Sequence, residues 1–405
     1  MKILHTADWH LGKRLDSFSR MEEQKKVMSE ICEIADRENV DLVIVAGDLF
    51  DVFNPSTEAI ELLYKTLKRL AKNGERPVIA IAGNHDSPDR IDAPDPLARE
   101  CGIIMIGYPN AQINLFSLPG FEVKKSSPGF LEINLNKYNY PVRILHTPYA
   151  NEIRLKEYLG AENKEIRLNE ILKENWKKIA NEFCDEQGVN LLTAHLFIMK
   201  KGGEIPEEPE GEKPIKIGNA DLIYSEIIPH QIQYTALGHL HACRNMGSEE
   251  KPVVYASSPL AYSFSEAGQQ KYVVLIDAEP GRKVTMEKIS LKEGKELLRK
   301  TFTEVDEAVN WLEKNQNSLV ELTLETVEFM TAEERRKIYQ AHPGIVHLIP
   351  KLSKEMETDA EVKEIDLSLD VRLLFKDYFK SKHNQEPNQE ILELFNEILS
   401  ENDTH

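Results

Sequence analysis

The sequence is poor in cysteine and has no long apolar run, and both shortages narrow what it can be. Its four cysteines, Cys32, Cys101, Cys184 and Cys243, are widely spaced and form no Cys-x-x-Cys pair. That pattern fits neither a disulfide framework nor a structural zinc site, so we interpret them as free thiols. Apolar runs such as Leu42 to Ala46 are far shorter than the roughly 18 residues that a membrane-spanning helix needs. The sequence therefore predicts a protein without membrane spans.

An export signal and an excess of basic residues are also missing. The first ten residues include His5 and Asp8, where a secretory signal requires an unbroken apolar stretch, so we expect a cytoplasmic protein. There are 50 Lys and Arg against 68 Asp and Glu, a formal net charge of −18. This charge excludes a protein that coats nucleic acid electrostatically. DNA remains possible as a substrate, because metal ions or a basic partner can make a cleft locally positive.

What is present is the pattern of an α/β domain followed by smaller parts. The 405 residues predict two or three domains at about 150 residues each. Residues 1–277 alternate short apolar runs with amphipathic stretches such as Arg20 to Glu38 and Thr57 to Lys72. A segment rich in Pro, Gly and Glu, Lys200 to Gly218, predicts an exposed loop. The runs that predict buried strands are Ile3 to Thr6, Leu42 to Ala46, Val78 to Ala82, Arg143 to His146, Leu191 to Ala194, Tyr234 to Leu237, Val253 to Ala256 and Tyr272 to Ile276.

The pattern changes beyond residue 278. Residues 278–352 read as β-α-β-α-β, with helices at Glu304 to Asn315 and Ala332 to Ala341, which predicts a small domain of split βαβ type. An acidic linker follows at 353–366. Residues 367–405 then predict two amphipathic helices, which either pack on their own chain or offer their apolar faces to a partner.

Five polar motifs each follow one of the predicted strands. Because functional groups in α/β sheets gather at the carboxyl ends of the strands, we expect these motifs to converge on one site. They are Asp8-Trp9-His10, Gly47-Asp48, Gly83-Asn84-His85-Asp86, His195 and Gly238-His239-Leu240-His241.

The residue types in these motifs are ligands for two metal ions. Residues i and i+2 of an extended segment lie on the same side, so Asp8 with His10, and His239 with His241, can each face one centre. Asp48 is placed to bridge two cations. The set is completed by Asn84 and His195, and such mixed nitrogen and oxygen ligands favour Mn²⁺, Fe or Zn²⁺ over Mg²⁺ and Ca²⁺. Mn²⁺ is our first choice.

Two such cations would support hydrolysis of a phosphoester without a covalent intermediate. His85 follows a predicted ligand and cannot easily reach the same ion, which leaves it for protonating the leaving oxygen or stabilising the transition state. We expect Asp86 to orient the imidazole of His85 and Asp51 to support the ligands from behind.

The motifs GDxxD at 47–51, GNHD at 83–86 and GHLH at 238–241, with the initial DxH, resemble those of the calcineurin-like metallophosphoesterases. More narrowly, DWHLG, GDLFD, GNHDSPDR, TAHLF, ALGHLH and SSPLAYSFSE resemble the nuclease subunits of this family that work with an ATPase subunit. The resemblance implies a β-sandwich flanked by helices, with a small α+β capping domain and a C-terminal helix pair. One departure is Ser257, where relatives usually have glycine.

The resemblance also implies roles for individual residues. Asp8, His10, Asp48 and His241 would bind one Mn²⁺, and Asp48, Asn84, His195 and His239 the second. His85 would be catalytic. The implied activity is metal-dependent endonuclease and 3′ to 5′ exonuclease cleavage of double-stranded DNA ends and hairpins.

Partners follow from the same resemblance. Residues 368–401 would dock on the coiled coil of the ATPase subunit in a heterotetramer, and a homodimer is expected through helices at Arg20 to Glu38 or Thr57 to Lys72. The chain has no GxxxxGK[ST] motif, so any dependence on ATP must come from that partner.

Basic residues near the motifs are candidate contacts for the DNA backbone, whereas His5 and His146, in strands outside the motif set, are interpreted as structural. The candidate contacts are Lys13, Arg14, Arg20, Arg90 and Arg244.

Two other functions fit part of the pattern. A phosphomonoesterase or cyclic nucleotide phosphodiesterase would use the same two-metal chemistry, but it needs neither residues 278–352 nor the helix pair. A structural DNA-end tether with a vestigial site is disfavoured by the complete ligand set.

Overall fold

The computed structural model describes residues 1–159, 164–203, 222–326 and 330–352, together with 374–376, 379, 387, 392 and 395. The chain divides into two compact units, Met1–Leu324 with Met330–Pro350, and Glu325–Phe329 with Lys351–His405. The predicted linker at 353–366, most of the predicted helix pair and most of the loop at 200–218 lie outside the described residues.

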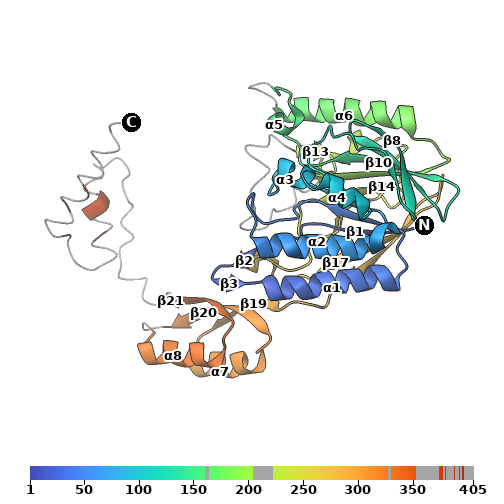
Figure 1. Cartoon of the computed structure of the whole chain (residues 1–405). Coiled ribbons are helices and arrows are strands. Elements are labelled where there is room, and N and C mark those ends of the chain that lie inside the picture. Colours follow the sequence, from blue (N-terminus) through green and yellow to red (C-terminus); the bar gives the residue numbers. More distant parts are fainter. Residues whose placement is uncertain are drawn as a thin grey trace. The chain divides into compact units, whose positions relative to one another are not determined.

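Two mixed sheets pack face to face in the first unit (Figure 1). In the six-stranded sheet, β1, β4, β5 and β6 are parallel and β17 and β18 are antiparallel to their neighbours. Its strands, in spatial order, are β18 (Thr285–Ser290), β17 (Tyr272–Asp277), β1 (Lys2–Thr6), β4 (Leu42–Ala46), β5 (Val78–Ile81) and β6 (Ile103–Ile106).

The eight-stranded sheet has a parallel centre, β16, β14, β11 and β10, and antiparallel edges. Its order is β15 (Arg244–Asn245), β16 (Val253–Tyr255), β14 (Tyr234–Gly238), β11 (Val189–His195), β10 (Pro141–Thr147), β9 (Phe130–Leu135), β8 (Phe121–Ser127) and β7 (Phe116–Ser117). Two short pairs are β2 (Arg14–Leu15) with β3 (Phe18–Ser19), and β12 (Phe197–Met199) with β13 (Leu222–Tyr224).

Helices cover the outer face of each sheet, so the order of layers is helix, sheet, sheet, helix (Figure 1). The pair α1 and α2 covers the six-stranded sheet, and α6 covers the eight-stranded sheet. The helices of the described chain are α1 (Met21–Arg37), α2 (Thr57–Ala71), α3 (Pro88–Asp92), α4 (Asp95–Glu100), α5 (Glu152–Leu155), α6 (Lys164–Phe183), α7 (Val305–Lys314) and α8 (Ala332–Ala341).

The parallel strands are apolar on both faces because both faces are buried. In β4, Leu42 and Ile44 face the core between the sheets, while Val43 and Val45 face the core under α1 and α2. All eight apolar runs that predicted strands form strands, and the two predicted N-terminal helices match α1 and α2 within one residue at each end. The α/β architecture of mixed sheets and covering helices is confirmed.

The segment beyond residue 278 departs from the predicted element order. The first strand expected there, β18, pairs with β17 and belongs to the six-stranded sheet. The three-stranded sheet instead begins with β19 (Glu296–Phe302), which the sequence did not predict, and continues with β20 (Ser318–Thr326) and β21 (Ile345–Leu352). The predicted helices correspond to α7 and α8.

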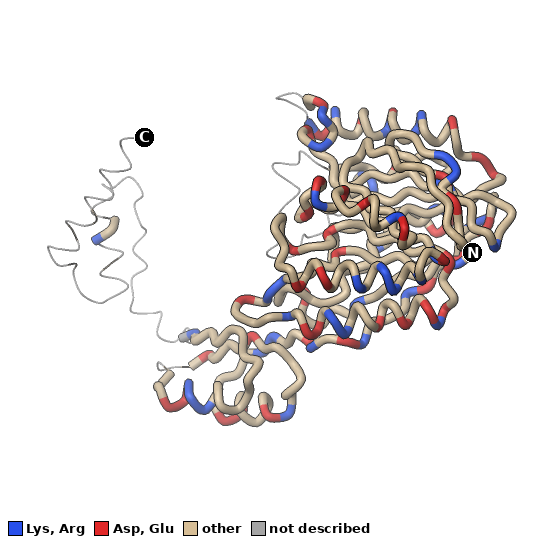
Figure 2. Tube along the Cα trace, in the orientation of Figure 1, with Lys and Arg blue, Asp and Glu red and all other residues tan. Residues whose placement is uncertain are grey.

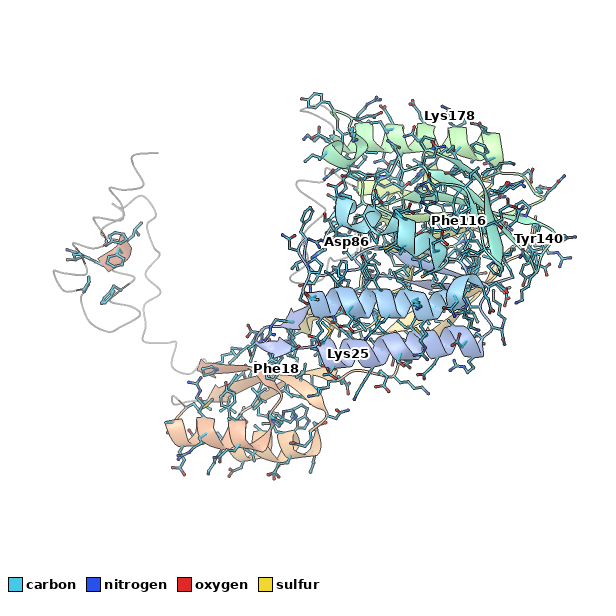
Figure 3. The ribbon with its side chains drawn as sticks, in the orientation of Figure 1. Phe18, Lys25, Asp86, Phe116, Tyr140 and Lys178 are labelled. Atoms are coloured by element: carbon cyan, nitrogen blue, oxygen red, sulfur yellow. The ribbon has the colours of Figure 1, made fainter. Side chains whose placement is uncertain are left out.

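A small apolar cluster joins this sheet to the β2–β3 hairpin. Leu15 and Phe264 pack with Leu297 and Leu319, and Phe18 lies against them (Figure 3). The three-stranded sheet therefore contacts the loops that follow the motif strands.

Within the described residues, no helix is long and apolar enough to cross a membrane. The four cysteines all lie in described parts of the chain and are free thiols, as predicted. In the second unit, the rings of Phe375 and Phe395 stack with their centroids 3.9 Å apart. These two residues come one from each of the predicted C-terminal helices.

Candidate metal centre

The five motifs meet at the carboxyl ends of five strands. Asp8 and His10 follow β1, Asp48 follows β4, and Asn84 with His85 follows β5 of the six-stranded sheet. From the facing sheet, His195 ends β11, and His239 and His241 follow β14. Except for the half-buried Asn84, these side chains are almost completely buried.

The backbone is left-handed at four of these positions. The φ angles are 53° at Asp8, 43° at His10, 47° at Asp48 and 105° at His239. Each such conformation costs a non-glycine residue on the order of 1–3 kcal/mol, and this strain is typical of functional sites. Hydrogen bonds from the amide of Asp8 to Gly47 O (3.0 Å) and from that of His10 to Asp48 O (2.9 Å) hold the two loops together.

Two of the motif positions require glycine because another side chain packs directly against their backbone. A Cβ atom at Gly47, where φ is +95°, would lie 2.1 Å from Nδ1 of His195. A Cβ atom at Gly83 would lie 2.0 Å from Oδ1 of Asp48. Only glycine lets these strand ends pack directly against the neighbouring ligand side chains.

One set of ligand atoms gathers around His10. Its Nε2 lies 3.0 Å from Nε2 of His241 and 3.6 Å from Oδ2 of Asp48. Asp8, His10 and Asp48 also offer ligand atoms that all lie within 4.8 Å of one another. These residues can therefore face a single cation.

A second set gathers around His195. Its Nε2 lies 2.9 Å from Oδ1 of Asn84 and 3.2 Å from Oδ2 of Asp48. The rings of His195 and His239 meet edge to face with centroids 5.7 Å apart. Oδ2 of Asp48 thus lies within 3.6 Å of both His10 and His195, which is where a bridging carboxylate would have to be.

The burial of these carboxylates fits cation binding. Oδ2 of Asp8 and Oδ2 of Asp48 are buried without a hydrogen-bond partner in the described structure, and a buried carboxylate oxygen without a partner is costly. Burial raises the pKa of Asp8 to about 7. Burial would raise the pKa of Asp48 as well, but His195 and His10 hold it well below its usual range. The donor set, imidazole nitrogens with carboxylate and amide oxygens, suits Mn²⁺, Fe or Zn²⁺.

The charge on His195 depends on the same carboxylates. Burial would lower the pKa of His195, but Asp48 and Asp8 outweigh it and raise this pKa to about 9. Binding of a divalent cation through His195 would require a ring nitrogen without hydrogen, so cation binding at this residue would compete with protonation.

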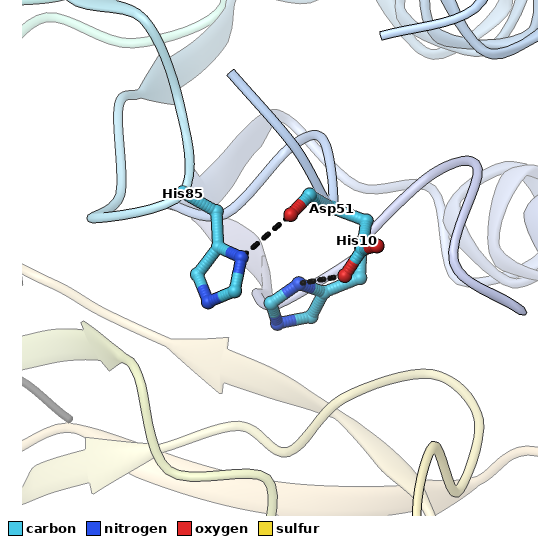
Figure 4. A group of neighbouring side chains, drawn as sticks. All are labelled: His10, Asp51 and His85. Carbon is cyan, nitrogen blue, oxygen red and sulfur yellow. Dashed lines mark hydrogen bonds and ion pairs between the residues drawn. The ribbon is translucent and has the colours of Figure 1, made fainter. Parts of the chain in front are cut away.

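His85 lies beside His10 of the first set, with ring centroids 4.8 Å apart, and is held by Asp51. Nδ1 of His85 lies 2.6 Å from the carbonyl oxygen of Asp51, whose carboxylate is 3.7 Å from Nδ1 of His10 (Figure 4). Because a carbonyl can only accept, Nδ1 of His85 donates to Asp51 O. His85, Asp51 and His10 also form a second group of atoms within 4.8 Å.

Comparisons with known proteins agree with this geometry. A family model described as calcineurin-like phosphoesterase matches residues 1–243. The SbcD subunit of the nuclease SbcCD from Bacillus subtilis (strain 168) is 33% identical over 407 residues, which is 99% of this chain and 98% of that protein. The chain belongs to the calcineurin-like phosphoesterases, among the SbcD nuclease subunits. It is thus a phosphoester hydrolase.

Two further comparisons are more distant. The SbcD subunit of the nuclease SbcCD from Staphylococcus epidermidis (strain ATCC 12228 / FDA PCI 1200) is 27% identical over 412 residues, 98% of this chain and 99% of that protein. A dimetal phosphatase from Danio rerio superposes with a TM-score of 0.39 at 12% identity, covering 73% of this chain and 99% of that one. So low a TM-score carries no argument about function.

In this phosphoesterase, Asp86 has a different task from the one predicted. Its carboxylate accepts the backbone N–H groups of Leu49 (3.0 Å), Phe50 (2.9 Å) and Gly83 (2.8 Å). Asp86, labelled in Figure 3, therefore ties the loop after β4 to the loop after β5 through these three hydrogen bonds. The ring of His85 is oriented instead by the carbonyl of Asp51, on which the sequence could give no information.

Of the basic residues proposed to contact DNA, Arg20 is a wrong prediction. It is 1% exposed, and its guanidinium is bound to Glu23 (2.7 Å) and to the carbonyl of Ala261 (2.8 Å). Lys13 is half-buried and bound to the Asp51 carboxylate at 3.0 Å. The remaining three are exposed, namely Arg14, Arg90 and Arg244.

A cleft beside the centre has walls from three parts of the chain. Its cavity of about 510 Å³ is lined by His85 and Asp51, by Lys13 and Arg14, and by Glu321 and His347 of the three-stranded sheet. His347 bridges the wall, with Nδ1 2.9 Å from Glu321 and Nε2 3.5 Å from Asp16.

Sequence reasoning missed three buried residues of the site. Glu266 accepts Nδ1 of His241 at 3.1 Å and is paired with Lys271 at 2.5 Å. Arg154 donates to the carbonyl oxygens of Gly83 (2.8 Å) and Asp86 (2.7 Å), on either side of Asn84 and His85. Glu266 could have been noticed because it is the last residue of the motif SSPLAYSFSE. Lys271 and Arg154 have no spacing pattern that distinguishes them from charged residues on the surface.

Proposed function

We propose that this chain is the nuclease subunit of a complex with the ATPase SbcC, and that it cleaves double-stranded DNA ends and hairpins during repair, recombination and replication. The activity would be metal-dependent, with 3′ to 5′ exonuclease and endonuclease action. The observation that carries the proposal is the convergence of seven ligand side chains and a separate His85 in a chain similar, over nearly its whole length, to the SbcD proteins of two bacteria.

The contacts support the division of ligands between two cations, which we assign as Mn²⁺. Asp8, His10 and His241 would hold the first, and Asn84, His195 and His239 the second, with Asp48 shared. The short distances fall within these sets: His10 to His241 is 3.0 Å and His195 to Asn84 is 2.9 Å. Bound there, two divalent cations would polarise a phosphoryl oxygen and lower the pKa of an attacking water.

In this proposal the protein residues orient His85, and His85 provides a proton. His85 is fixed through Nδ1, so its Nε2–H form would donate a proton to the leaving oxygen or hydrogen-bond the charge that develops there. Asp86 and Arg154 fix the loop that carries His85 from two sides. Tight packing excludes other water from the ligands, which strengthens each of these interactions.

The cleft is consistent with a polymeric substrate. It extends from His85 to the three-stranded sheet, which in our proposal acts as a capping domain and which a minimal phosphatase does not need. Lys and Arg are interspersed with Asp and Glu along the chain trace (Figure 2), so attraction of DNA would depend on bound cations and on local groups such as Arg14, Arg90 and Arg244.

The partner would dock on the C-terminal helices. Residues 367–405 follow the acidic linker, and the stacking of Phe375 on Phe395, one residue from each predicted helix, supports a paired arrangement of the two helices. We propose that this pair binds SbcC in a heterotetramer built on a homodimer of the nuclease subunit. The domain division at 1–277, 278–352, 353–366 and 367–405 belongs to this proposal, except that β18 of the second range pairs with β17 and so belongs with the first.

An end-labelled hairpin duplex tests the function. The purified chain is incubated with the hairpin in Mn²⁺, with His85→Asn as the test variant and His230→Asn, at an exposed position, as the control. We expect cleavage by wild type and control, and none by His85→Asn at wild-type Mn²⁺ content. Equal loss of Mn²⁺ in His85→Asn would make His85 a ligand. Hydrolysis of p-nitrophenyl phosphate esters without DNA cleavage, even with SbcC and ATP, would contradict the proposal.

A further inference from the structure

A buried ion pair lies directly behind one of the proposed ligands. Glu266 is 2% exposed and Lys271 is 6% exposed, and both lie beside His241. Neither follows a strand end in the way the ligand motifs do: Glu266 ends a short 3₁₀ turn at Phe264–Glu266, and Lys271 immediately precedes β17.

The ammonium of Lys271 has all three of its donors occupied. They go to Oε2 of Glu266 (2.5 Å), the carbonyl oxygen of His241 (2.9 Å) and Oγ of Ser258 (3.1 Å). Lys271 therefore holds both the carboxylate that contacts the His241 ring and the backbone that carries it. Balancing the charge of Glu266 would require only the contact to its carboxylate. The additional hydrogen bond to the carbonyl of His241 indicates that Lys271 also positions the backbone of this residue.

The carboxylate of Glu266 has only acceptors to offer, because it receives Lys271 and also the backbone N–H of Tyr262 at 3.2 Å. Its partner at 3.1 Å, Nδ1 of His241, must then carry the hydrogen. The other nitrogen, Nε2, lies 3.0 Å from Nε2 of His10, inside the first ligand set. Hydrogen-bonding a ligand histidine to a carboxylate fixes its tautomer and strengthens it as a donor.

Lys271 makes this arrangement possible in a buried site. A lone carboxylate beside an imidazole would either remain an uncompensated buried charge or draw a proton onto the ring. With Lys271 present, the pair of Glu266 and Lys271 is neutral, and His241 can stay neutral with its Nε2 lone pair toward the cation.

We propose that Glu266 and Lys271 form a clamp that positions His241, fixing its ring with hydrogen on Nδ1 and Nε2 toward the first cation. They are positioning residues, and neither touches substrate. The inference rests on the metal-binding part of the proposed function, but it does not depend on DNA being the substrate.

The test uses the full chain and two measurements. The tautomer of His241 is read from the ¹⁵N spectrum of histidine-labelled, metal-free protein, with the signals assigned by their loss in His241→Asn. Mn²⁺ affinity is measured by calorimetric titration. The variants are Glu266→Gln, Lys271→Met and the double variant, which removes both charges and so leaves no unpaired buried ion.

We expect the double variant to unfold near the wild-type temperature, to show a mixture of His241 tautomers, and to bind the weaker-held Mn²⁺ about 10- to 100-fold less tightly. The matched control is Glu279→Gln with Arg282→Met, an ion pair at 2.6 Å whose side chains are 56% and 76% exposed. It should change neither measurement.

A double variant with the wild-type tautomer would overturn the clamp, whatever its Mn²⁺ affinity, because the loss would then be structural only. Unchanged Mn²⁺ affinity at both steps would also overturn it. Wild-type chain that binds Mn²⁺ without cutting DNA would contradict the proposed function alone, since the clamp is judged by the tautomer and the affinity.

Discussion

Arg154 gives the sharpest prediction about how the fold places the catalytic loop. It lies on α5, a single turn whose first N–H groups are capped by Asn151, and it is 8% exposed. Its guanidinium donates to Gly83 O and Asp86 O and lies over the ring of Tyr149 at 4.9 Å. Arg154→Met keeps the length and the apolar stem but removes both donors.

The size of the effect follows from these two contacts. A hydrogen bond from a charged donor contributes about 1.5–3 kcal/mol, so the loss of two such bonds costs at most about 3–6 kcal/mol of stability. The desolvation penalty of the buried guanidinium is removed at the same time, which reduces this cost. A domain with a free energy of unfolding of roughly 5–15 kcal/mol can still fold. Displacement of His85 by about 1 Å would lower the rate on the order of 100-fold.

Single-turnover cleavage of the hairpin duplex in Mn²⁺ is the assay, with urea denaturation to establish the folded fraction. We expect the single-turnover rate constant at saturating enzyme to fall about 100-fold in Arg154→Met, with little change in the enzyme concentration that gives half of this rate. Arg154→Lys, which can reach one carbonyl, should recover part of the rate. Arg167→Met, on the exposed face of α6 and paired with Glu170 at 3.4 Å, is the control. A folded Arg154→Met with the wild-type rate constant would refute the reasoning.

Three further predictions concern packing, pH and the partner. Gly83→Ala should abolish Mn²⁺ binding, because its Cβ would lie 2.0 Å from Oδ1 of Asp48. The control is Gly268→Ala, whose Cβ would meet no atom within 4 Å and which should cost only about 1 kcal/mol of stability. Equal Mn²⁺ affinities of the two variants in calorimetry would contradict this prediction. Burial lowers the pKa of His5 from 6.5 to about 3, so the unfolded chain binds the extra proton between these values. The contribution of His5 to stability is therefore complete above about pH 6.5 and is about 2 kcal/mol smaller at about pH 5. In urea denaturation, His5→Gln should lose about 2 kcal/mol less than wild type on going from about pH 6.5 to about pH 5, and an identical loss would exclude this contribution of His5. Removal of residues 367–405 should abolish co-purification with SbcC and leave Mn²⁺ binding intact; a truncated chain that still co-purified would place the interface elsewhere.

The convergence of the proposed ligand residues could be predicted from the sequence because each lies at or just after the end of a strand that is itself easy to recognise. Runs such as Leu42 to Ala46 are apolar at every position, and parallel strands bring their carboxyl ends together whatever the distance along the chain. The type of each ligand then followed from its side chain. The glycines next to Asp48 and Asn84 are part of the same signal, because no other residue fits there.

The edges of the fold and the supports of the site could not be predicted in this way. β18 (TMEKIS) was expected as a strand, but its mostly exposed side chains gave no signal for the sheet to which it belongs. β19 (ELLRKTF) is also mostly exposed and charged, and it had no apolar run to mark it as a strand. Arg20 resembled a surface cation, yet its ion pair with Glu23 is buried. Lys271 and Arg154 reach the site through tertiary contacts that leave no periodic trace in the sequence.

Anomalous scattering at the manganese edge, from crystals of the full chain grown in Mn²⁺, tests the central claim most directly. We expect two peaks per chain, one beside His10 and His241 and one beside Asn84 and His195, with the carboxylate of Asp48 between them. A single peak, or peaks away from Asp48, would contradict the two-metal account of this nuclease.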